Sequence, residues 1–536
     1  MKKIIIFAIA VATLFAFSSC QKENLQDNGT TNGVRIITAE FENNATKTNL
    51  NSDGVTPEWK AGDVIRILNT TTHQDVPLTD GNITDNKITF TTSLTGDLYA
   101  VYPATATSMT SCPDGEITFT IPAIQDGTFG SANICVAKST EDDGTNKDNL
   151  IFRNATAVLK ITTSSAVVGV DVTATNFIAG EVTATFSGTA ISLTTTSLDR
   201  HYVSAVGTSA PTGNVFYLAA APVTTGAAKV NCYTTEKKGT VEKESKDLSK
   251  NIIYNMDLTS VVPAISDLTG QHGLLNGHEY VIIKAKYDGT NETYLKWATM
   301  NIGATTLTGI TSHGDYYMWG ATELIYDDVN RAAENNNFSI ISSKPSAAKY
   351  NHNAPDWNQA QGFYWDNAPF IKKNYTETYK DAFNKYTTKN EYAQSGSADD
   401  KSSLDSSDDA ASTEWMSTWR MPMKGDFSAL LDATYGVWDS TDKGYYVFAP
   451  DADYEAGERS SSGSDLSKSN ALLFFPAAGY GTSKNITFPG YGGFYWSKSL
   501  DTDDNSKAFL LMVNTSSTTN SKFERYRGHS IRPVSN

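Results

Sequence analysis

The chain has 536 residues and a formal net charge of −16, with 43 Lys and Arg against 59 Asp and Glu. At about 150 residues per domain, this length predicts three to four domains. Hydrophobic residues make up 39% of the chain, which excludes a wholly disordered protein. The negative charge repels phosphate backbones, so we expect no nucleic-acid partner.

The N-terminus reads as an export signal. Two lysines precede an apolar stretch at 4–17, and two serines precede Cys20. This order predicts a secretory signal peptide at 1–20. Cys20 after small residues resembles a bacterial lipobox, in which the thiol is lipidated, although Phe17 stands where Leu is usual. The alternative is a conventional signal with an incidental cysteine.

Lipidation of Cys20 would anchor the chain to outer-membrane lipid without a spanning helix. Residues 21–33 are polar and without apolar periodicity, so we expect a flexible tether there. After the first twenty positions the sequence contains no apolar run of about 18 residues, and we expect no later transmembrane helix.

Three further cysteines follow, Cys112, Cys135 and Cys232. An odd number cannot pair completely within one chain, and the sequence does not choose a pair. The sequence has no Cys-x-x-Cys, which argues against a thiolate zinc site.

Two compositions divide the rest. Residues 34–262 are rich in Thr, Val, Ile, Ala and Asn and contain one tryptophan, whereas 275–536 contain the other eight. We expect a linker at 263–274. Short β-branched or aromatic runs separated by turn residues predict strands in the first part. These runs are 64–68, 87–91, 98–102, 117–121, 157–161, 168–173, 214–218 and 252–258. They predict two tandem antiparallel β-sandwiches, at 34–148 and 149–262.

The first part resembles the fimbrillin-like family of Bacteroides-type fimbrial subunits and surface lipoproteins. The segments that carry the resemblance are 37–41, 46–48, 58–65, 98–103, 121–125, 152–160 and 217–222. In that family a protease cuts after a basic residue near the N-terminus and removes the first strand. The vacated groove then accepts a strand from the next subunit.

The resemblance implies a processing site in this chain. Arg35 precedes the apolar pair at 36–37 and is the candidate, and Lys47 and Arg66 are other cleavable positions. An ordinary solvated arginine is the alternative for Arg35. If no site is cut, the protein stays anchored by lipid.

The C-terminal part mixes strands with two expected helices, at 405–418 and 424–431. Strands are expected at 280–285, 294–298, 444–448, 471–475, 493–496, 508–513 and 529–534. Long polar stretches at 323–404 and 451–469 separate them. Loops of that length in a compact domain are usually functional or mobile.

This part resembles the Fibrobacter succinogenes major paralogous domain. The matching segments are 296–304, 314–320, 408–411, 419–423, 426–427, 474–480, 495–499 and 528–534. The resemblance implies an α+β, C-type-lectin-like domain over 275–536 that binds a ligand.

Catalysis is not expected. His313, His352 and His529 are not accompanied by a Gly-x-Ser-x-Gly or His-Glu-x-x-His motif. A structural hydrogen bond is expected for His529. The sequence has no cysteine after Cys232, which argues against the copper chemistry of formylglycine-generating enzymes.

Calcium is the one cofactor that the sequence suggests. Asp501, Asp503, Asp504 and Asn505 place four oxygen-bearing side chains within five residues, and hard cations prefer such ligands. The alternative is an acidic solvated turn between two strands.

Aromatic side chains in the long polar stretch suggest a sugar-stacking surface. Trp357, Trp365 and Asp366 are the candidate ligand contacts, and packing of the loop is the alternative. The tryptophans within the resembling segments are expected in the core instead. They are Trp297, Trp319, Trp419 and Trp496.

The sequence therefore favours a surface lipoprotein that acts as a fimbrial or fimbrium-associated adhesin. Its partners would be other fimbrial subunits and a carbohydrate or surface-protein ligand. The expected last sandwich strand, 252–258, runs into the C-terminal part, so it is not free to be donated; this fits a tip position. A glycan-binding lipoprotein for nutrient capture is the alternative, and a carbohydrate-active enzyme is a third hypothesis that lacks an identifiable catalytic pair.

Overall fold

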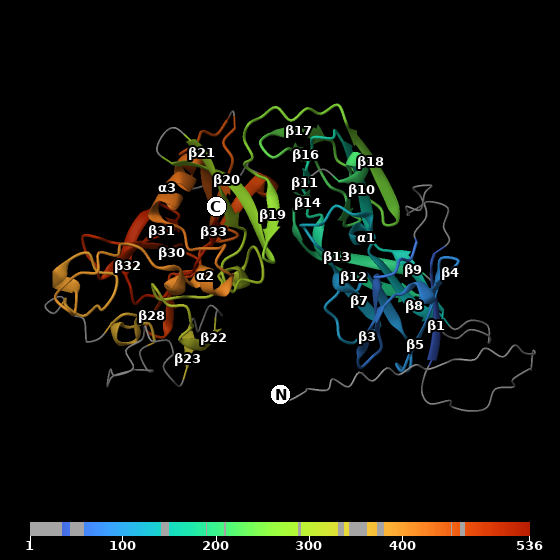
Figure 1. Cartoon of the computed structure of the whole chain (residues 1–536), viewed down its shortest axis with the longest axis horizontal. Helices are drawn as coiled ribbons and strands as arrows, with labels where there is room; N and C mark the ends of the chain where they lie inside the picture. Colours follow the sequence, from blue (N-terminus) through green and yellow to red (C-terminus); the bar gives the residue numbers. More distant parts are fainter. Residues whose placement is uncertain are drawn as a thin grey trace, which may run out of the picture.

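The computed structural model describes residues 35–42, 58–140, 149–188, 190–207, 211–287, 291–330, 337–341, 362–371, 380–451, 453–460 and 467–536. These residues form a mainly β protein, as expected for the N-terminal part. Figure 1 shows two bodies that meet near the top of the view, one holding β1–β18 and the other β19–β33. Cys20, the tether and Trp357 lie outside the described residues.

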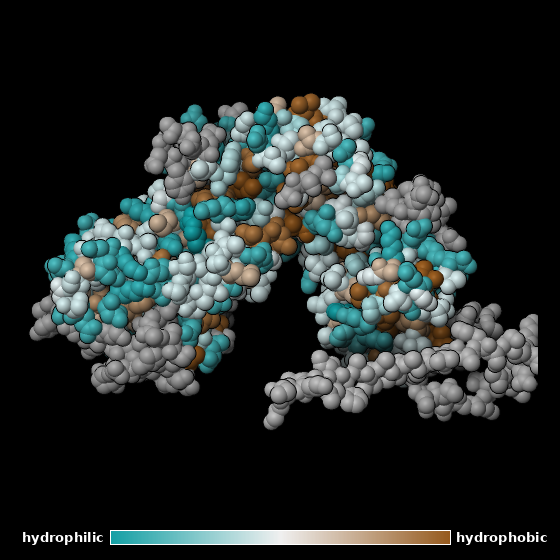
Figure 2. Space-filling view, viewed as in Figure 1, coloured by the Kyte–Doolittle hydropathy of each residue, from teal (hydrophilic) through white to brown (hydrophobic). Residues whose placement is uncertain are grey.

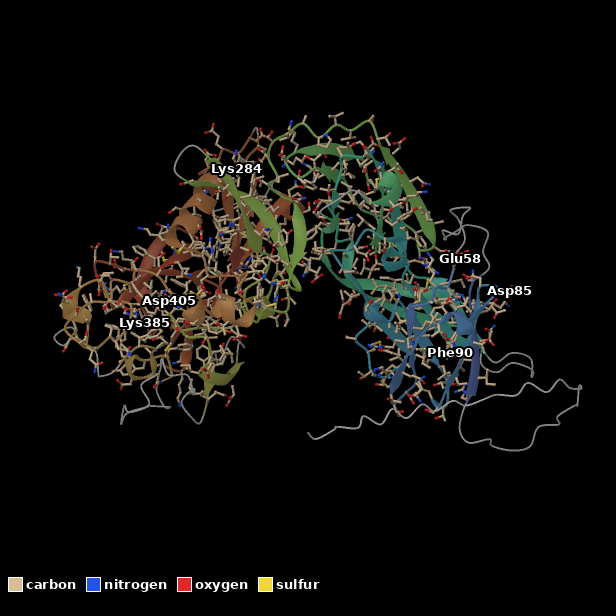
Figure 3. All side chains as sticks on the ribbon, viewed as in Figure 1. Glu58, Asp85, Phe90, Lys284, Lys385 and Asp405 are labelled. Carbon is tan, nitrogen blue, oxygen red and sulfur yellow. The ribbon has the colours of Figure 1, made fainter. Side chains whose placement is uncertain are left out.

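The first sandwich is one sheet with the strand order β3-β2-β6-β8-β9-β1-β5-β4. Every second residue of β5 is buried, as expected for a strand with one face in the core. Side chains of Ile37, Ile65 and Phe90 share one core, so the sheet curls around it (Phe90 is labelled in Figure 3). The strands are β1 (Arg35–Phe41), β2 (Val64–Leu68), β3 (His73–Pro77), β4 (Ile83–Thr84), β5 (Lys87–Thr92), β6 (Tyr99–Tyr102), β8 (Cys135–Thr140) and β9 (Asn149–Asn154).

The second sandwich has three sheets, with orders β15-β10-β18, β14-β11-β16-β17 and β13-β12-β7. Its strands are β7 (Glu116–Ile121), β10 (Ala157–Thr163), β11 (Gly169–Ala174), β12 (Ala179–Ser187), β13 (Ala190–Arg200), β14 (Tyr202–Val206), β15 (Val215–Ala220), β16 (Ala228–Tyr233), β17 (Lys238–Lys243) and β18 (Ile252–Leu258). A short helix, α1 (Phe129–Ala132), packs beside β15.

The division between the sandwiches differs from the expected one at 148–149. β9 pairs with β8 and β1 of the first sheet, so that sheet ends at Asn154. β7 pairs with β12 of the second sandwich, although it precedes β8 in the chain. The chain therefore crosses between the sandwiches before it completes the first. The expected linker at 263–274 is also shorter, because β19 begins at His272.

The C-terminal body has four sheets, with orders β19-β20-β21-β33, β22-β23-β29-β28, β26-β24-β25-β27 and β30-β31-β32. Its strands are β19 (His272–Leu275), β20 (His278–Tyr287), β21 (Asn291–Ala298), β22 (Tyr326–Asn330), β23 (Asn337–Ile340), β24 (Tyr435–Asp439), β25 (Gly444–Phe448), β26 (Arg459–Ser460), β27 (Ala471–Pro476), β28 (Tyr480–Thr482), β29 (Asn485–Thr487), β30 (Gly492–Leu500), β31 (Lys507–Asn514), β32 (Thr518–Glu524) and β33 (Val534–Ser535). The C-type-lectin-like fold of 275–536 stays a prediction.

Tryptophan burial follows the expectation for this body. Trp297, Trp319, Trp419 and Trp496 are all fully buried. Trp297 lies in the core that includes β20 and β21, and Trp319 and Trp496 lie in a second core. Large indole rings therefore fill this body, as their place in the resembling segments indicated.

The expected helix at 405–418 is wrong in extent. Only α2 (Ala410–Glu414) forms, after a 3-10 turn at Ser406–Asp408. Asp409 caps α2 by accepting the backbone N–H of Ser412 at 3.1 Å. Met416 adopts a left-handed φ of 72°, which does not continue a right-handed helix. The other expected helix is present as α3 (Lys424–Ala433).

The expected strand at 529–534 is also shorter. Only β33 forms there, while His529 and Ser530 make isolated bridges to Tyr317 and Tyr495. The bridge to Tyr495 joins this segment to β30, and β33 pairs with β21. Residues 529–535 are consequently held against two sheets of the C-terminal body.

Ion pairs connect part of the long polar stretch at 323–404 to the segment that follows it. Lys385 Nζ lies 2.8 Å from Asp405 and 2.6 Å from Asp408, and Figure 3 labels Lys385 and Asp405 beside each other. Hydrogen bonds from Lys385 and Lys401 lower the pKa of Asp405 to about 2.

Two further findings concern the cysteines and the helices of the described residues. Cys112, Cys135 and Cys232 are free and buried. In the part of the chain that the structure describes, no helix is long and apolar enough to cross a membrane.

Candidate functional site

The two bodies are joined by a buried polar contact as well as by the chain. His272 of β19 places its Nδ1 2.7 Å from Asp171 Oδ2 of β11, and Asp171 is fully buried. The His272 ring stacks on Tyr202 of β14, with ring centroids 3.7 Å apart. The Ser204 hydroxyl donates to the His272 carbonyl at 3.3 Å. These contacts give the junction a defined geometry.

An ion pair crosses the same junction. Arg200, the last residue of β13, places its Nε 3.1 Å from Glu279 of β20. The Tyr202 hydroxyl donates to the same carboxylate at 3.0 Å. Glu279 is therefore held in the junction by one ion pair and one hydrogen bond.

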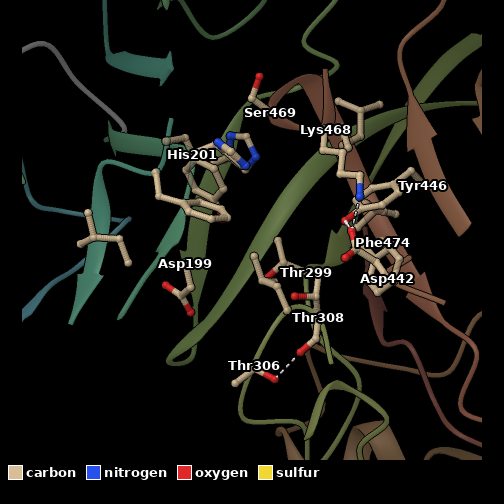
Figure 4. Close-up of a pocket in the computed structure, with 18 residues that line it drawn as sticks. Asp199, His201, Thr299, Thr306, Thr308, Asp442, Tyr446, Lys468, Ser469 and Phe474 are labelled. Atoms are coloured by element: carbon tan, nitrogen blue, oxygen red, sulfur yellow. Dashed lines mark hydrogen bonds and ion pairs between the residues drawn. The ribbon is translucent and has the colours of Figure 1, made fainter. Parts of the chain in front are cut away.

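Beside these contacts lies a pocket of about 480 Å³, shown in Figure 4. Its lining comes from residue 177 and segment 198–202 of the second sandwich, from His272, and from segments 299–308 and 442–474 of the C-terminal body. Apolar residues gather where the two bodies meet in Figure 2. Binding pockets often lie between domains, and this volume is in the usual range for small ligands.

The sandwich wall combines an exposed ring with two titratable groups. Phe177 is 44% exposed, and its ring lies 4.1 Å from that of His201. Within the described part of the chain, His201 Nδ1 is buried without a hydrogen-bond partner. Burial lowers the pKa of His201 and raises that of Asp199, which pairs with Arg200. An imidazole and a carboxyl group therefore line the pocket from this side.

The opposite wall is built on β25 and β27. The Tyr446 hydroxyl and Lys468 Nζ each donate to Asp442 at 2.6 Å. Lys468 also lies 2.9 Å from Asp439, so its charge is already balanced. The rings of Tyr446 and Phe474 lie 4.5 Å apart. This wall thus places two largely buried aromatic rings beside a fixed carboxylate.

Sequence reasoning did not find this pocket. Its walls come from segments that are distant in the sequence, and none of them contains a spacing typical of a binding motif. The position of Phe177 in a turn between β11 and β12 was the one local signal, because an aromatic residue in a turn is often exposed for contact.

The expected ligand residue Trp365 lies elsewhere, in the 3-10 turn Trp365–Asn367. It is half-buried, and its ring lies 4.8 Å from Tyr526 and 5.9 Å from Phe383. Its neighbour Tyr364 is 40% exposed. Asp366 is half-buried in the same turn. This turn is a second aromatic surface, and its role in ligand binding stays a prediction.

The expected calcium loop has its oxygens turned toward protein donors. The two carboxylate oxygens of Asp501 each lie 2.9 Å from Lys522 Nζ. The side chain of Asp503 is 86% exposed and lies 3.9 Å from the same lysine. A lysine at this position competes with a cation for both acids.

The other two residues of that loop are also engaged. Burial opposes ionisation of Asp504, yet hydrogen bonds from Ser506, Lys507 and Tyr392 hold its pKa at about 2. Asn505 Oδ1 accepts a backbone N–H from Thr388 at 2.7 Å. Among the described residues, no group of three or more His, Cys, Asp and Glu side chains is placed to hold a metal ion. The calcium site stays a prediction.

The candidate processing residue, Arg35, begins β1. Its backbone pairs with Thr92 of β5, and its guanidinium donates to the carbonyls of Leu94 at 3.1 Å and Gly96 at 2.8 Å. The peptide bond after Arg35 therefore lies inside a paired strand. Of the other cleavable positions, Arg66 lies within β2 and pairs with Asp75, and Lys47 lies outside the described residues.

The sequence matches no model of a known protein family, and no curated protein matches it. Among solved structures, a Bacteroides ovatus protein described as a candidate cell adhesion protein matches at 15% identity and a TM-score of 0.27, over 43% of this chain and 96% of its own. A fimbrial assembly protein of Parabacteroides distasonis matches at 8% identity and 0.24, over 49% and 98%. The tip fimbrial protein Mfa3 of Porphyromonas gingivalis, truncated at its C-terminus, matches at 9% identity and 0.25, over 49% and 99%.

Proposed function

We propose that this chain is a cell-surface adhesin that joins a fimbria as its terminal subunit and binds, rather than converts, its ligand. The proposal includes lipidation at Cys20, export to the outer membrane and a ligand-binding role for the C-terminal body. The observation that carries it is the contrast between β1, which could leave its sheet, and β18, which could not.

β18 is engaged along its whole length. It pairs in parallel with β10, from Ile252 opposite Ala157 to Leu258 opposite Thr163. The chain then continues into β19, which is held against the second sandwich by the His272–Asp171 contact. A strand bound in this way is not available to complete the sheet of another subunit.

β1 is a central strand of its sheet, and only its C-terminal end continues into the next strand of the fold. It lies between β5, to which it is antiparallel, and β9, to which it is parallel. Its removal would leave two facing strand edges with unpaired backbone groups. Such a gap accepts an extended strand from a partner through main-chain hydrogen bonds.

The geometry bears on where a releasing cut would fall. A cut after Arg35 would leave residues 36–41 attached to the chain, because they precede the connection to β2. A cut after Lys47, in that connection, would separate the whole of β1 from β2. The proposal therefore places the releasing cut between β1 and β2, where Lys47 lies, and not after Arg35.

Peptide exchange tests strand acceptance. The same protease recognition sequence is inserted into residues 43–57 in one variant and into residues 141–148 in a control variant. After cleavage, a fluorescent peptide with the sequence of residues 35–42 is added in excess, and its uptake is followed by anisotropy. We expect uptake by the first variant, because its β1 is no longer covalently held.

The control cut falls between β8 and β9 and leaves β1 attached to β2. We expect no uptake by the cut control or by the uncut chains. Equal uptake by both cut variants, or none by the first while circular dichroism shows it folded, would refute strand acceptance.

The alternative function is capture of a glycan at the cell surface without a fibre. The pocket between the two bodies favours it, because a binding site of that kind requires no assembly. In that case the chain would bind its ligand but fail to take up the peptide.

A further inference from the structure

We propose that the pocket between the second sandwich and the C-terminal body binds a short neutral saccharide. This inference rests on the proposed binding function and names its site and ligand class. It is carried by the aromatic faces, the hydrogen-bonding groups and the charge of the pocket.

Aromatic rings face the pocket from both bodies. Phe177 projects from the sandwich and is 44% exposed, although it is a large apolar side chain. Tyr446 and Phe474 line the opposite wall from a core cluster, where they are 7% and 6% exposed, so Phe177 is the ring that offers an open face. An exposed aromatic ring can stack on the apolar C–H face of a sugar ring. Ligand pockets typically combine aromatic side chains with a few polar groups that orient the ligand.

Hydrogen-bonding groups lie beside these rings. Asp199 and Asp442 supply carboxylate oxygens, which accept hydrogen bonds from hydroxyl groups. Threonine and serine side chains at positions 299, 306, 308 and 469 line the same pocket, and their hydroxyl groups can donate or accept hydrogen bonds.

The charge of the lining selects against anions. Lys468 is the one lysine or arginine among the described lining residues, and Asp442 and Asp439 already neutralise it. Asp199 and Glu279 share one cation, Arg200, just as Asp439 and Asp442 share Lys468, and this surplus of acids would repel a sialic acid or a sulfate group. A neutral ligand rich in hydroxyl groups is therefore favoured over an acidic one.

Binding of the purified full chain to neutral, sialylated and sulfated oligosaccharides tests the inference. We expect binding to neutral members only. Phe177→Ala and Asp199→Asn should each weaken it by about tenfold or more, equivalent to about 1.4 kcal/mol. Phe177→Tyr should retain it, because the aromatic face is kept.

Two controls lie outside the pocket. Tyr491→Ala removes an aromatic side chain that is 74% exposed, and Trp365→Ala alters the other aromatic surface. We expect wild-type binding in both, and thermal melting checks that every variant is folded. Loss of binding in Trp365→Ala alone would overturn the inference and move the site.

Two other results would also overturn it. One is unchanged binding in both pocket variants, and the other is no binding of the wild type to any neutral saccharide. Because peptide exchange at β1 is measured separately, failure of the pocket can be distinguished from failure of strand acceptance.

Discussion

His529 shows how burial alone sets the chemistry of one side chain. It is fully buried, and within the described structure neither ring nitrogen has a hydrogen-bond partner. The ring instead packs among Tyr480, Phe494 and Trp496. The structural hydrogen bond expected from the sequence is made by the His529 backbone, which bonds Tyr317 in both directions at 3.0 Å, and not by the ring, whose surroundings are aromatic.

Burial, assisted by the charge of Arg527, lowers the pKa of His529 well below 6.5. As the pH falls through about 6.5, the unfolded chain binds a proton that the folded chain does not, so folding stability declines. Between about pH 7.5 and pH 5 this group should cost up to about 2 kcal/mol. Urea unfolding at the two pH values measures it, and His529→Leu should reduce the decline.

The same substitution at His73, half-buried on β3, is the control. It should leave the pH dependence of the wild type in place. An equally steep decline in His529→Leu would show that other groups cause it.

At the scale of an element, β1 has two faces with opposite roles. Ile37 is fully buried in the first core, whereas the adjacent Ile36 is 65% exposed. Ile37→Ala should destabilise the sandwich by about 2–5 kcal/mol. Ile36→Ala, on the same strand, should change stability by about 0.5 kcal/mol or less. Hydrogen exchange of the β5 and β9 amides reports the difference.

Equal exchange in the two variants would contradict the placement of β1. It would mean that neither face of β1 is needed to keep β5 and β9 in one sheet. The strand could then leave without opening an acceptor site.

Elements were predictable where local pattern and tertiary packing agree. β2 and β18 have the bounds expected from their β-branched runs and flanking turns. The 405–418 helix failed because Asp409 caps a shorter helix inside that window and Met416 turns the chain away. The end of a helix depends on capping hydrogen bonds and on residues with positive φ. Apolar periodicity predicts neither of these, so it does not predict where the helix stops.

At the scale of the whole molecule, the distribution of tryptophan predicted two bodies, but nothing predicted how they meet. Asp171 and His272 belong to the two sides of the junction and are far apart in the sequence. Neither stands in a recognisable motif, and a buried pair of this kind arises only when the strands are placed. The pocket beside them was missed for the same reason.

The central claim is that the chain can accept a strand but cannot pass one on. Electron microscopy of cells that produce it, with gold-labelled antibody against residues 275–536, tests this directly. We predict gold at the ends of fibres, because β18 is committed to β10 and the chain continues into the C-terminal body. Gold along the length of the fibres, or on the cell surface with no fibre attached, would contradict the account.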